Sequence, residues 1–210
     1  MRFLVTAGPT REYLDDVRFI SNASSGRMGY AVAAAAARAG HRVDLVSGPV
    51  NIKPPPGVRL VSVVSTQEMY RAVAKRFPSA DCLVGAAAPA DFRPARRAAG
   101  KPKKASEPRT LEVRPTVDIL AALGERKKRG QVIVAFALEV RRPVANALAK
   151  MKLKNADAIV LNRPDAMGAA RSSASILLRG GERITLRGAA KQIIGRRIVA
   201  LAEKLHAPGA

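Results

Sequence analysis

The chain has 210 residues, with 37 Lys or Arg against 16 Asp or Glu, so its formal net charge is +21. Its one cysteine excludes a disulfide scaffold and a cysteine-based metal site, and its two histidines, far apart in the sequence, argue against a histidine-built one. The charge favours anionic ligands such as nucleotides, whereas aromatic residues at 4% argue against a single-strand nucleic-acid binder. Without a signal-peptide pattern or an uncharged apolar run of 18 residues, we expect a cytoplasmic protein with no membrane partner.

Apolar runs alternate with amphipathic stretches along the chain. The apolar runs predict strands at 2–6, 41–46, 59–64, 81–87, 131–137 and 157–161. Helical periodicity predicts helices at 26–39, 65–77, 117–128, 143–155 and 189–205. Gly40 stands just past the first helix, and Ser65 with Glu68 has capping-box spacing at the second. The pattern predicts an α/β fold, a Rossmann-like, mostly parallel sheet with helices on both faces, in one domain over 1–210.

Two segments depart from this alternation. Residues 92–108 are basic, contain prolines and lack apolar periodicity, so we expect a mobile basic loop. Residues 175–187 alternate apolar and polar around Gly180-Gly181, which predicts a C-terminal β-hairpin with Arg179 and Glu182 as a cross-strand ion pair. One domain would leave the apolar face of this hairpin uncovered, so we expect a homodimer.

Ligands of parallel α/β sheets bind at the carboxyl ends of the strands. The loop after the first strand lacks both Gly-x-Gly-x-x-Gly and a Walker motif, but it leads through 24–26 to a helix N-terminus, which favours an anion. An ordinary serine cap fits the same residues. After the 81–87 strand, the small residues let a flat ligand approach the backbone. Asp91 suits Mg²⁺ on a polyphosphate, or a helix cap.

Other signals are weaker when each is taken alone. Asp44 lies where a nicotinamide enzyme keeps its ribose-binding acid, but no tyrosine is followed four residues later by lysine, which argues against a short-chain dehydrogenase. Lys150 and Lys154 share one helix face, and Lys101 belongs to a run of charges. Solvated surface charge explains each of these lysines as well as a binding site does.

In combination and in order, the motifs resemble the phosphopantothenoylcysteine synthetase (phosphopantothenate–cysteine ligase) family over residues 2–162. The motifs are Thr-Ala-Gly-Pro-Thr-Arg-Glu, Ile-Ser-Asn-x-Ser-Ser-Gly, Ala-Ala-Ala-x-Ala-Asp-Phe, Lys-x-Lys-Lys, Asp-Ile-Leu, Phe-Ala-x-Glu and Lys-x-x-x-Lys-x-x-Asp-x-Ile-Val-x-Asn. Three places depart from the family pattern: Thr116-Val117 stands for Asn-Pro with Pro115 one place earlier, and Pro89 and Pro102 interrupt two motifs.

The resemblance implies a ligase of coenzyme A biosynthesis. The carboxylate of 4′-phosphopantothenate would attack the α-phosphate of a nucleoside triphosphate, CTP in bacterial members and ATP in eukaryotic ones, and cysteine would then attack the acyl-nucleotide. We expect CTP, with Mg²⁺ carried on the triphosphate and its protein ligands unknown. Because the chain starts at the synthetase's first strand, we expect a standalone homodimeric synthetase without flavin, working with a separate phosphopantothenoylcysteine decarboxylase.

The resemblance also implies roles for individual residues. Asn22 and Lys101 are the expected catalytic residues: Asn22 holds the acyl group during cysteine attack, and Lys101 neutralises charge on the α-phosphate. The expected nucleotide-binding residues are Gly8, Gly85, Ala86, Ala87, Asp91, Lys101, Val117, Asp118, Ile119, Leu120, Phe136, Lys150 and Lys154. The expected substrate-binding residues are Asn22, Ser24, Ser25 and Gly26. A non-catalytic nucleotide- or nucleic-acid-binding relative of this fold is the alternative, although joint retention of these residues argues against it.

Overall fold

Eight strands form one central sheet in the computed structural model, which describes residues 1–103, 110–162 and 171–207. Their bounds are β1 (Arg2–Ala7), β4 (Arg42–Ser47), β5 (Val58–Ser62), β6 (Cys82–Gly85), β9 (Val132–Leu138), β10 (Ala158–Asn162), β11 (Arg171–Leu178) and β12 (Arg183–Ala190). The order is β12-β11-β10-β9-β6-β1-β4-β5. Neighbours from β10 to β5 run parallel, and β11 and β12 continue antiparallel, which confirms the predicted fold class.

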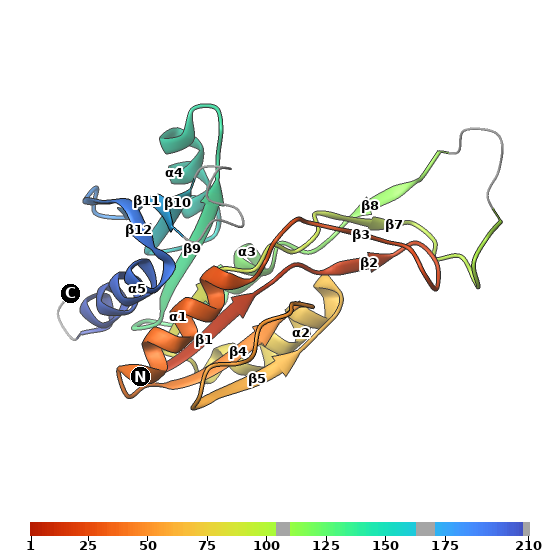
Figure 1. Ribbon diagram of the computed structural model, residues 1–210. Helices are drawn as coiled ribbons and strands as arrows, with labels where there is room; N and C mark the ends of the chain where they lie inside the picture. The colour runs from red at the N-terminus through yellow and green to blue at the C-terminus, as the bar shows by residue number, and fades with distance from the viewer. Residues whose placement is uncertain (104–109, 163–170, 208–210) are drawn as a thin grey trace.

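Helices cover both faces of this sheet, as predicted (Figure 1). They are α1 (Arg27–Arg38), α2 (Thr66–Arg76), α3 (Ile119–Gly124), α4 (Pro143–Leu153) and α5 (Lys191–His206), with a 3₁₀ turn η1 at Phe77–Ser79. Successive strand residues point to opposite faces. In β1, Phe3 and Val5 therefore join the core under α1 and α5, and Leu4 joins the core under α2, α3 and α4.

Local sequence signals fix where two of the helices begin and end. At α2, the Glu68 N–H donates to Ser65 Oγ (3.2 Å), and the Glu68 carboxylate accepts from the Val64 N–H (2.8 Å). Helix α3 is shorter than the predicted 117–128. It begins after Asp118, which accepts from the Ala121 N–H (3.0 Å), and ends at Gly124, where a Cβ would overlap the Lys154 carbonyl oxygen.

Four short strands form an extension that we call the arm. β2 (Arg11–Tyr13) pairs with β3 (Phe19–Ser21), and β7 (Phe92–Pro94) pairs with β8 (Val113–Pro115). The two ribbons lie side by side and project beyond the central sheet (Figure 1). Periodicity cannot detect strands of three residues. The expected loop at 92–108 therefore begins with a strand, and its part from 104 to 108 lies outside the described residues.

One carboxylate organises the turn between β2 and β3. Asp15 accepts from the N–H groups of Arg18 (2.7 Å) and Val17 (2.8 Å) and from the Arg18 Nε (2.6 Å). Its side chain is only 2% exposed. The hydrogen bond from the Arg18 N–H, followed by the one from Val17, holds the pKa of Asp15 below its ordinary value of 3.8. The turn is therefore built around an ionised carboxylate.

The variant Asp15→Asn is expected to lower the melting temperature by a few degrees at neutral pH, because an amide cannot accept all three hydrogen bonds. A lowered folded pKa contributes stability above the unfolded pKa, and this contribution is lost as pH falls through the folded value. The difference in melting temperature between Asp15→Asn and the wild type should therefore disappear at acidic pH. Thermal melts over a pH series measure it, with the exposed Glu125→Gln as control. A difference that is independent of pH would contradict this account.

The C-terminal hairpin is present, but two expectations about it are wrong. Residues 179–182 connect the strands, and Arg179 donates to Asn155 Oδ1 (2.6 Å) and the Ala156 carbonyl instead of pairing with Glu182. The apolar residues of β11 are also buried in the domain's own cores. Five of the exposed large hydrophobic side chains lie on the arm: Val17, Phe19, Phe92, Leu111 and Val113.

Candidate active site

The strand order opens a crevice beside β1. From β1 the chain passes to β4 and β5 on one side, then crosses to β6, β9 and β10 on the other. The connections after two neighbouring strands here run to opposite sides of the sheet, which leaves a crevice between them at the carboxyl ends of the strands. Ligands of open α/β sheets bind in such a crevice. Residues 85–87 follow β6 at this edge, and the loop after β1 leads to α1 at the same edge.

A first cavity, which we call cavity A, has a volume of about 330 Å³ and lies at the end of β6. It collects most of the expected nucleotide-binding residues: Gly85, Ala87, Asp91, Val117, Asp118, Ile119, Leu120, Phe136, Lys150 and Lys154. These residues come from β6, α3, β9, α4 and the adjoining connections. The fold thus brings together positions that are up to 69 residues apart in the sequence.

A second cavity, cavity B, has a volume of about 560 Å³. Its wall contains all four expected substrate-binding residues, Asn22, Ser24, Ser25 and Gly26. It also contains Ala86, one of the expected nucleotide-binding residues. Pro89, Asp91, Phe136 and Lys150 line both cavities. A ligand in cavity A and a ligand in cavity B would therefore meet at these four residues.

Two expected site residues line neither cavity. Gly8 has a φ of 74°, and a Cβ there would lie 2.9 Å from Val50 Cγ1, so this glycine serves close packing beneath the site. Lys101 is exposed on the arm, after Gly100, whose N–H donates to Asp16 (2.9 Å). The catalytic role of Lys101 stays a prediction.

The amide of Asn22 is anchored to the chain that follows β6. Its Nδ2 donates to the carbonyl oxygens of Pro89 (2.8 Å) and, at a longer distance, Ala88 (3.4 Å). Because two carbonyls accept from this nitrogen, the orientation of the amide is set by the hydrogen bonds themselves. Asn22 follows β3 directly, so this contact joins the arm to the wall of cavity B.

Both site lysines are held by carboxylates. Lys154 Nζ contacts both oxygens of Asp118 (2.7 and 2.5 Å), and Lys150 Nζ contacts Glu139 (2.7 Å). Burial raises the pKa of Asp118, but hydrogen bonds from Lys154 and from backbone N–H groups outweigh it and leave the pKa below its ordinary value. The hydrogen bond from Lys150 likewise lowers the pKa of Glu139. Each lysine side chain is thus oriented by an ion pair at the wall of cavity A.

The departures at 115–117 leave the wall of cavity A intact. Thr116 donates through Oγ1 to the Ala90 carbonyl (2.6 Å) and through its N–H to the Asp91 carbonyl (2.9 Å). Val117 lines the cavity, next to Asp118. The threonine therefore fastens this segment to the chain after β6, although Pro115 stands one place earlier than in the family pattern.

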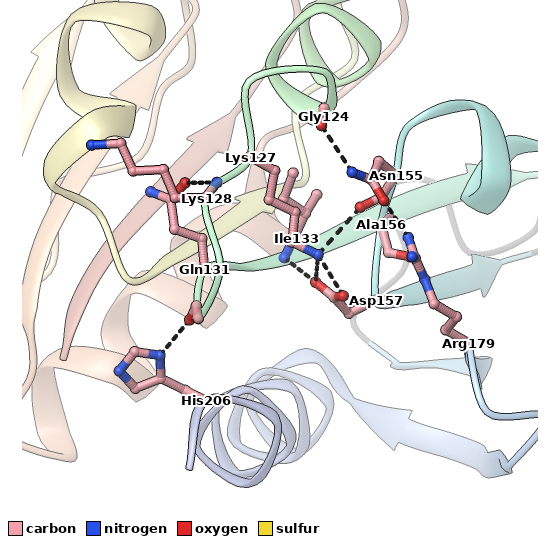
Figure 2. A network of polar contacts seen from close by, with 11 residues as sticks. Gly124, Lys127, Lys128, Gln131, Ile133, Asn155, Ala156, Asp157, Arg179 and His206 are labelled. Carbon is pink, nitrogen blue, oxygen red and sulfur yellow. Dashed lines mark hydrogen bonds and ion pairs between the residues drawn. The ribbon is translucent and has the colours of Figure 1, made fainter. Parts of the chain in front are cut away.

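The aspartate of the last motif has a structural role at the opposite edge of the sheet. Asp157 precedes β10, contacts Lys127 Nζ through both oxygens (2.5 and 2.6 Å) and accepts from the Ile133 N–H (2.8 Å). Figure 2 shows these contacts beside those of Asn155 and Arg179. The motif therefore combines cavity lysines with a residue that stabilises the amino ends of β9 and β10.

Three polar residues of cavity B were not predicted from the sequence: Arg27, Asn162 and Lys191. Arg27 and Lys191 are the first residues of α1 and α5, and neither helix has an acidic residue in its first turn. A cation at a helix N-terminus opposes the helix dipole, and this pattern was readable from the sequence. Asn162 ends the last quoted motif.

Within residues 1–103, 110–162 and 171–207, no three His, Cys, Asp or Glu side chains are grouped so that they could hold a metal ion. Asp91, which lines both cavities, is a single carboxylate at their junction. That fits Mg²⁺, which proteins commonly hold through one or two carboxylates and the phosphates of the substrate. Every helix in the described ranges is too short or too polar to cross a lipid bilayer.

Residues 1–205 match the family model of the DNA/pantothenate metabolism flavoprotein C-terminal domain. The chain belongs to this family. The match confirms the family resemblance that the motifs indicated. It extends past Asn162, where the motif resemblance fades, through the hairpin and α5.

Two curated relatives of this family are longer than the chain. A cysteine/cysteine sulfinic acid decarboxylase from an unknown prokaryotic organism is 47% identical over 162 residues, covering 77% of this chain and 45% of the relative. The coenzyme A biosynthesis bifunctional protein CoaBC of Bacillus subtilis is 45% identical over 167 residues, covering 79% and 41%. The chain thus matches less than half the length of either protein.

Solved structures share the fold over nearly the whole chain. The crystal structure of the C-terminal domain of a CoaBC protein is 38% identical, with a TM-score of 0.84, and covers 97% of this chain and 94% of that one. A Cab2 variant in complex with phosphopantothenate-cysteine is 17% identical, with a TM-score of 0.76 and coverage of 97% and 87%. At that identity, the likeness to Cab2 concerns the fold alone.

Proposed function

We propose that this protein is a phosphopantothenate–cysteine ligase of coenzyme A biosynthesis. The observation that carries the proposal is the junction of cavities A and B at Pro89, Asp91, Phe136 and Lys150. One cavity is lined by the expected nucleotide-binding residues and the other by the expected substrate-binding residues. The names of the CoaBC relatives agree with this chemistry.

The proposed reaction has two steps at the junction. A carboxylate oxygen of phosphopantothenate in cavity B attacks the α-phosphorus of CTP or ATP in cavity A, and pyrophosphate leaves. The cysteine amine then attacks the acyl carbon, loses a proton and displaces the nucleoside monophosphate. Lys150 and Lys154 would bind the phosphates, and Asn22 would orient the acyl group. Mg²⁺ held at Asp91 with the triphosphate would supply charge neutralisation.

Omission of one reactant at a time tests the proposed function. Purified protein is incubated with CTP or ATP, Mg²⁺, phosphopantothenate and cysteine, and pyrophosphate is measured. We expect release that depends on phosphopantothenate, with CTP preferred. Nucleotide binding without release of pyrophosphate from either nucleotide would favour the non-catalytic relative instead.

The variant Gly85→Ala is expected to raise the KM for the nucleotide about tenfold with little change in melting temperature. A Cβ at Gly85 would overlap the end of the Leu120 side chain, which is flexible and lines cavity A, so Leu120 should move into the space for the ligand. Gly180→Ala is the control, because a Cβ there meets no atom within 4 Å. An unchanged nucleotide KM in Gly85→Ala would contradict nucleotide binding in cavity A.

We further propose that the protein is a cytoplasmic homodimer that works with a phosphopantothenoylcysteine decarboxylase. The exposed Phe19 and Phe92 of the arm, together with its three exposed aliphatic residues, support self-association through the arm. The arm therefore replaces the hairpin as the expected interface.

A further inference from the structure

A third cavity lies at the edge of the central sheet opposite to cavities A and B. We call it the arginine cleft. It has a volume of about 390 Å³ and forms where β1, β4 and β5 begin and α2 ends. Its charged lining residues are Arg2, Arg42, Asp44, Arg59 and Arg76, and none of them lines cavity A or cavity B. The arginine cleft is therefore separate from the site to which the proposed function assigns the substrates.

The alternation of side chains along the strands directs four of these residues to one face of the sheet. Successive strand residues point to opposite faces. In β1, Leu4 points into the core under α2, and Arg2 lies two residues before it on the same face. In β4 and β5, the same even spacing before valines of this core places Arg42, Asp44 and Arg59 there. Three arginines thus converge beside the last residue of α2, which is itself an arginine.

The positive charge of the arginine cleft exceeds its negative charge. Asp44 contacts Arg59 (3.8 Å) and Arg76 (3.6 Å) at distances that are too long for hydrogen bonds. Arg2 and Arg42 lie in register on neighbouring strands, and neither guanidinium has a carboxylate partner among the residues that the structure describes. Neighbouring strands are about 4.8 Å apart, so these two like charges repel each other. A bound anion would remove this repulsion.

A nitrogen in the wall of the arginine cleft also indicates a ligand. Arg76 Nη1 donates to the Ala72 carbonyl (2.9 Å), but Arg76 Nε is buried and has no hydrogen-bond partner among the described residues. Asp81 accepts from the backbone N–H of Arg2 (2.7 Å) and does not line the cleft. Buried N–H groups are nearly always paired. The expected ligand is therefore an anion that presents several acceptor oxygens.

A diphosphate group has this chemistry, because it carries several negative charges on closely spaced oxygens. Arginine binds phosphate oxygens through two parallel N–H groups. We propose that the arginine cleft binds a diphosphate group through Arg2, Arg42 and Arg76. Phe3, the aromatic residue among those that line the cleft, is only 1% exposed and offers no ring face to a nucleobase. The phosphate groups, and not a base, are therefore what the cleft recognises.

Titration of the whole protein with pyrophosphate, in about 0.1 M salt and without Mg²⁺, tests the proposal. The ¹⁵Nε signal of Arg76, assigned by its loss in Arg76→Lys, reports binding in the arginine cleft separately from binding in cavity A. The titration is repeated on the double variant Arg2→Gln/Arg42→Gln. The control Arg196→Gln/Arg197→Gln removes the same charge from two exposed residues of α5 that line none of the three cavities.

We expect the Arg76 signal to shift with the same dissociation constant in the wild type and in the control. Affinity should fall about 10- to 100-fold in Arg2→Gln/Arg42→Gln. Without ligand, the melting temperature of this double variant should be no lower than that of the wild type, because the substitutions remove a pair of like charges. Inorganic phosphate should bind about tenfold more weakly than pyrophosphate, since it contacts fewer arginines.

Titration with ADP distinguishes the two sources of a diphosphate group. Tighter binding of ADP identifies a diphosphate ester as the ligand, and tighter binding of pyrophosphate identifies the free anion. Either result supports the proposal.

An Arg76 signal that responds to neither ligand would overturn the proposal, and this result requires only the wild type and not a stable variant. Equal loss of affinity in the two double variants would also overturn it, because binding would then depend on overall charge. Neither result bears on the proposed ligase activity, since the arginine cleft takes no part in the proposed reaction.

Discussion

Asn22→Asp is expected to form the acyl-nucleotide at close to the wild-type rate and to pass it to cysteine about 10²–10³-fold more slowly, so that the intermediate accumulates. In the wild type, the Asn22 amide donates to the Pro89 carbonyl (2.8 Å) beside the junction of the cavities. A carboxylate has no hydrogen to donate there. It would be repelled by the two backbone carbonyls and by the acyl oxygen, on which negative charge grows during amine attack.

Mass spectrometry of quenched reactions measures the acyl-nucleotide directly. Asn51→Asp makes the same chemical change on an exposed residue that lines neither cavity A nor cavity B, and it should behave as the wild type. If Asn22→Asp instead blocks pyrophosphate release and no intermediate is found, Asn22 acts in activation and its assigned role is wrong.

Lys101→Gln is expected to slow activation by about 10²–10³-fold, equivalent to roughly 3–4 kcal/mol of transition-state stabilisation. The lysine charge would be used mainly as negative charge builds on the five-coordinate α-phosphorus, so kcat should fall with little change in the KM for nucleotide. Since Lys101 lies on the arm and lines neither cavity, the effect also requires the arm, of this chain or of a second copy, to cover the triphosphate.

Pyrophosphate release in single-turnover reactions without cysteine isolates the activation step. Lys103→Gln removes the same charge from an exposed position two residues away and is the matched control. A wild-type rate in Lys101→Gln, or an equal loss in both variants, would show that Lys101 has no specific role in activation.

The strands and helix starts could be predicted because their signals are local. Continuous apolar runs mark β6, β9 and β10, and Ser65 with Glu68 marks the start of α2. The strands of the arm were not predictable, because three residues are too few to show a period. The Arg179–Glu182 pair was wrong because Arg179 turns towards Asn155 and Ala156, which are distant in the sequence.

The candidate site also contains residues that could be predicted from local sequence and residues that could not. Residues in continuous motifs, such as Asn22 and Asp91, could be identified from the sequence because each motif keeps its neighbours together. Contacts between residues far apart in the sequence could not be predicted. The ion pair of Lys154 with Asp118, for example, joins positions 36 residues apart. Lys191 escaped notice because only the packing of α5 against α1 brings it into the wall of cavity B.

The path of one oxygen atom tests most directly whether the two cavities form one site for carboxylate activation. Phosphopantothenate labelled with ¹⁸O in its carboxylate is allowed to react with cysteine and the preferred nucleotide, and the masses of the products are measured by mass spectrometry. Attack on the α-phosphorus followed by amine displacement predicts one ¹⁸O in the nucleoside monophosphate and none in pyrophosphate. Label in pyrophosphate or inorganic phosphate, or an unlabelled monophosphate, would contradict the proposed acyl-nucleotide route.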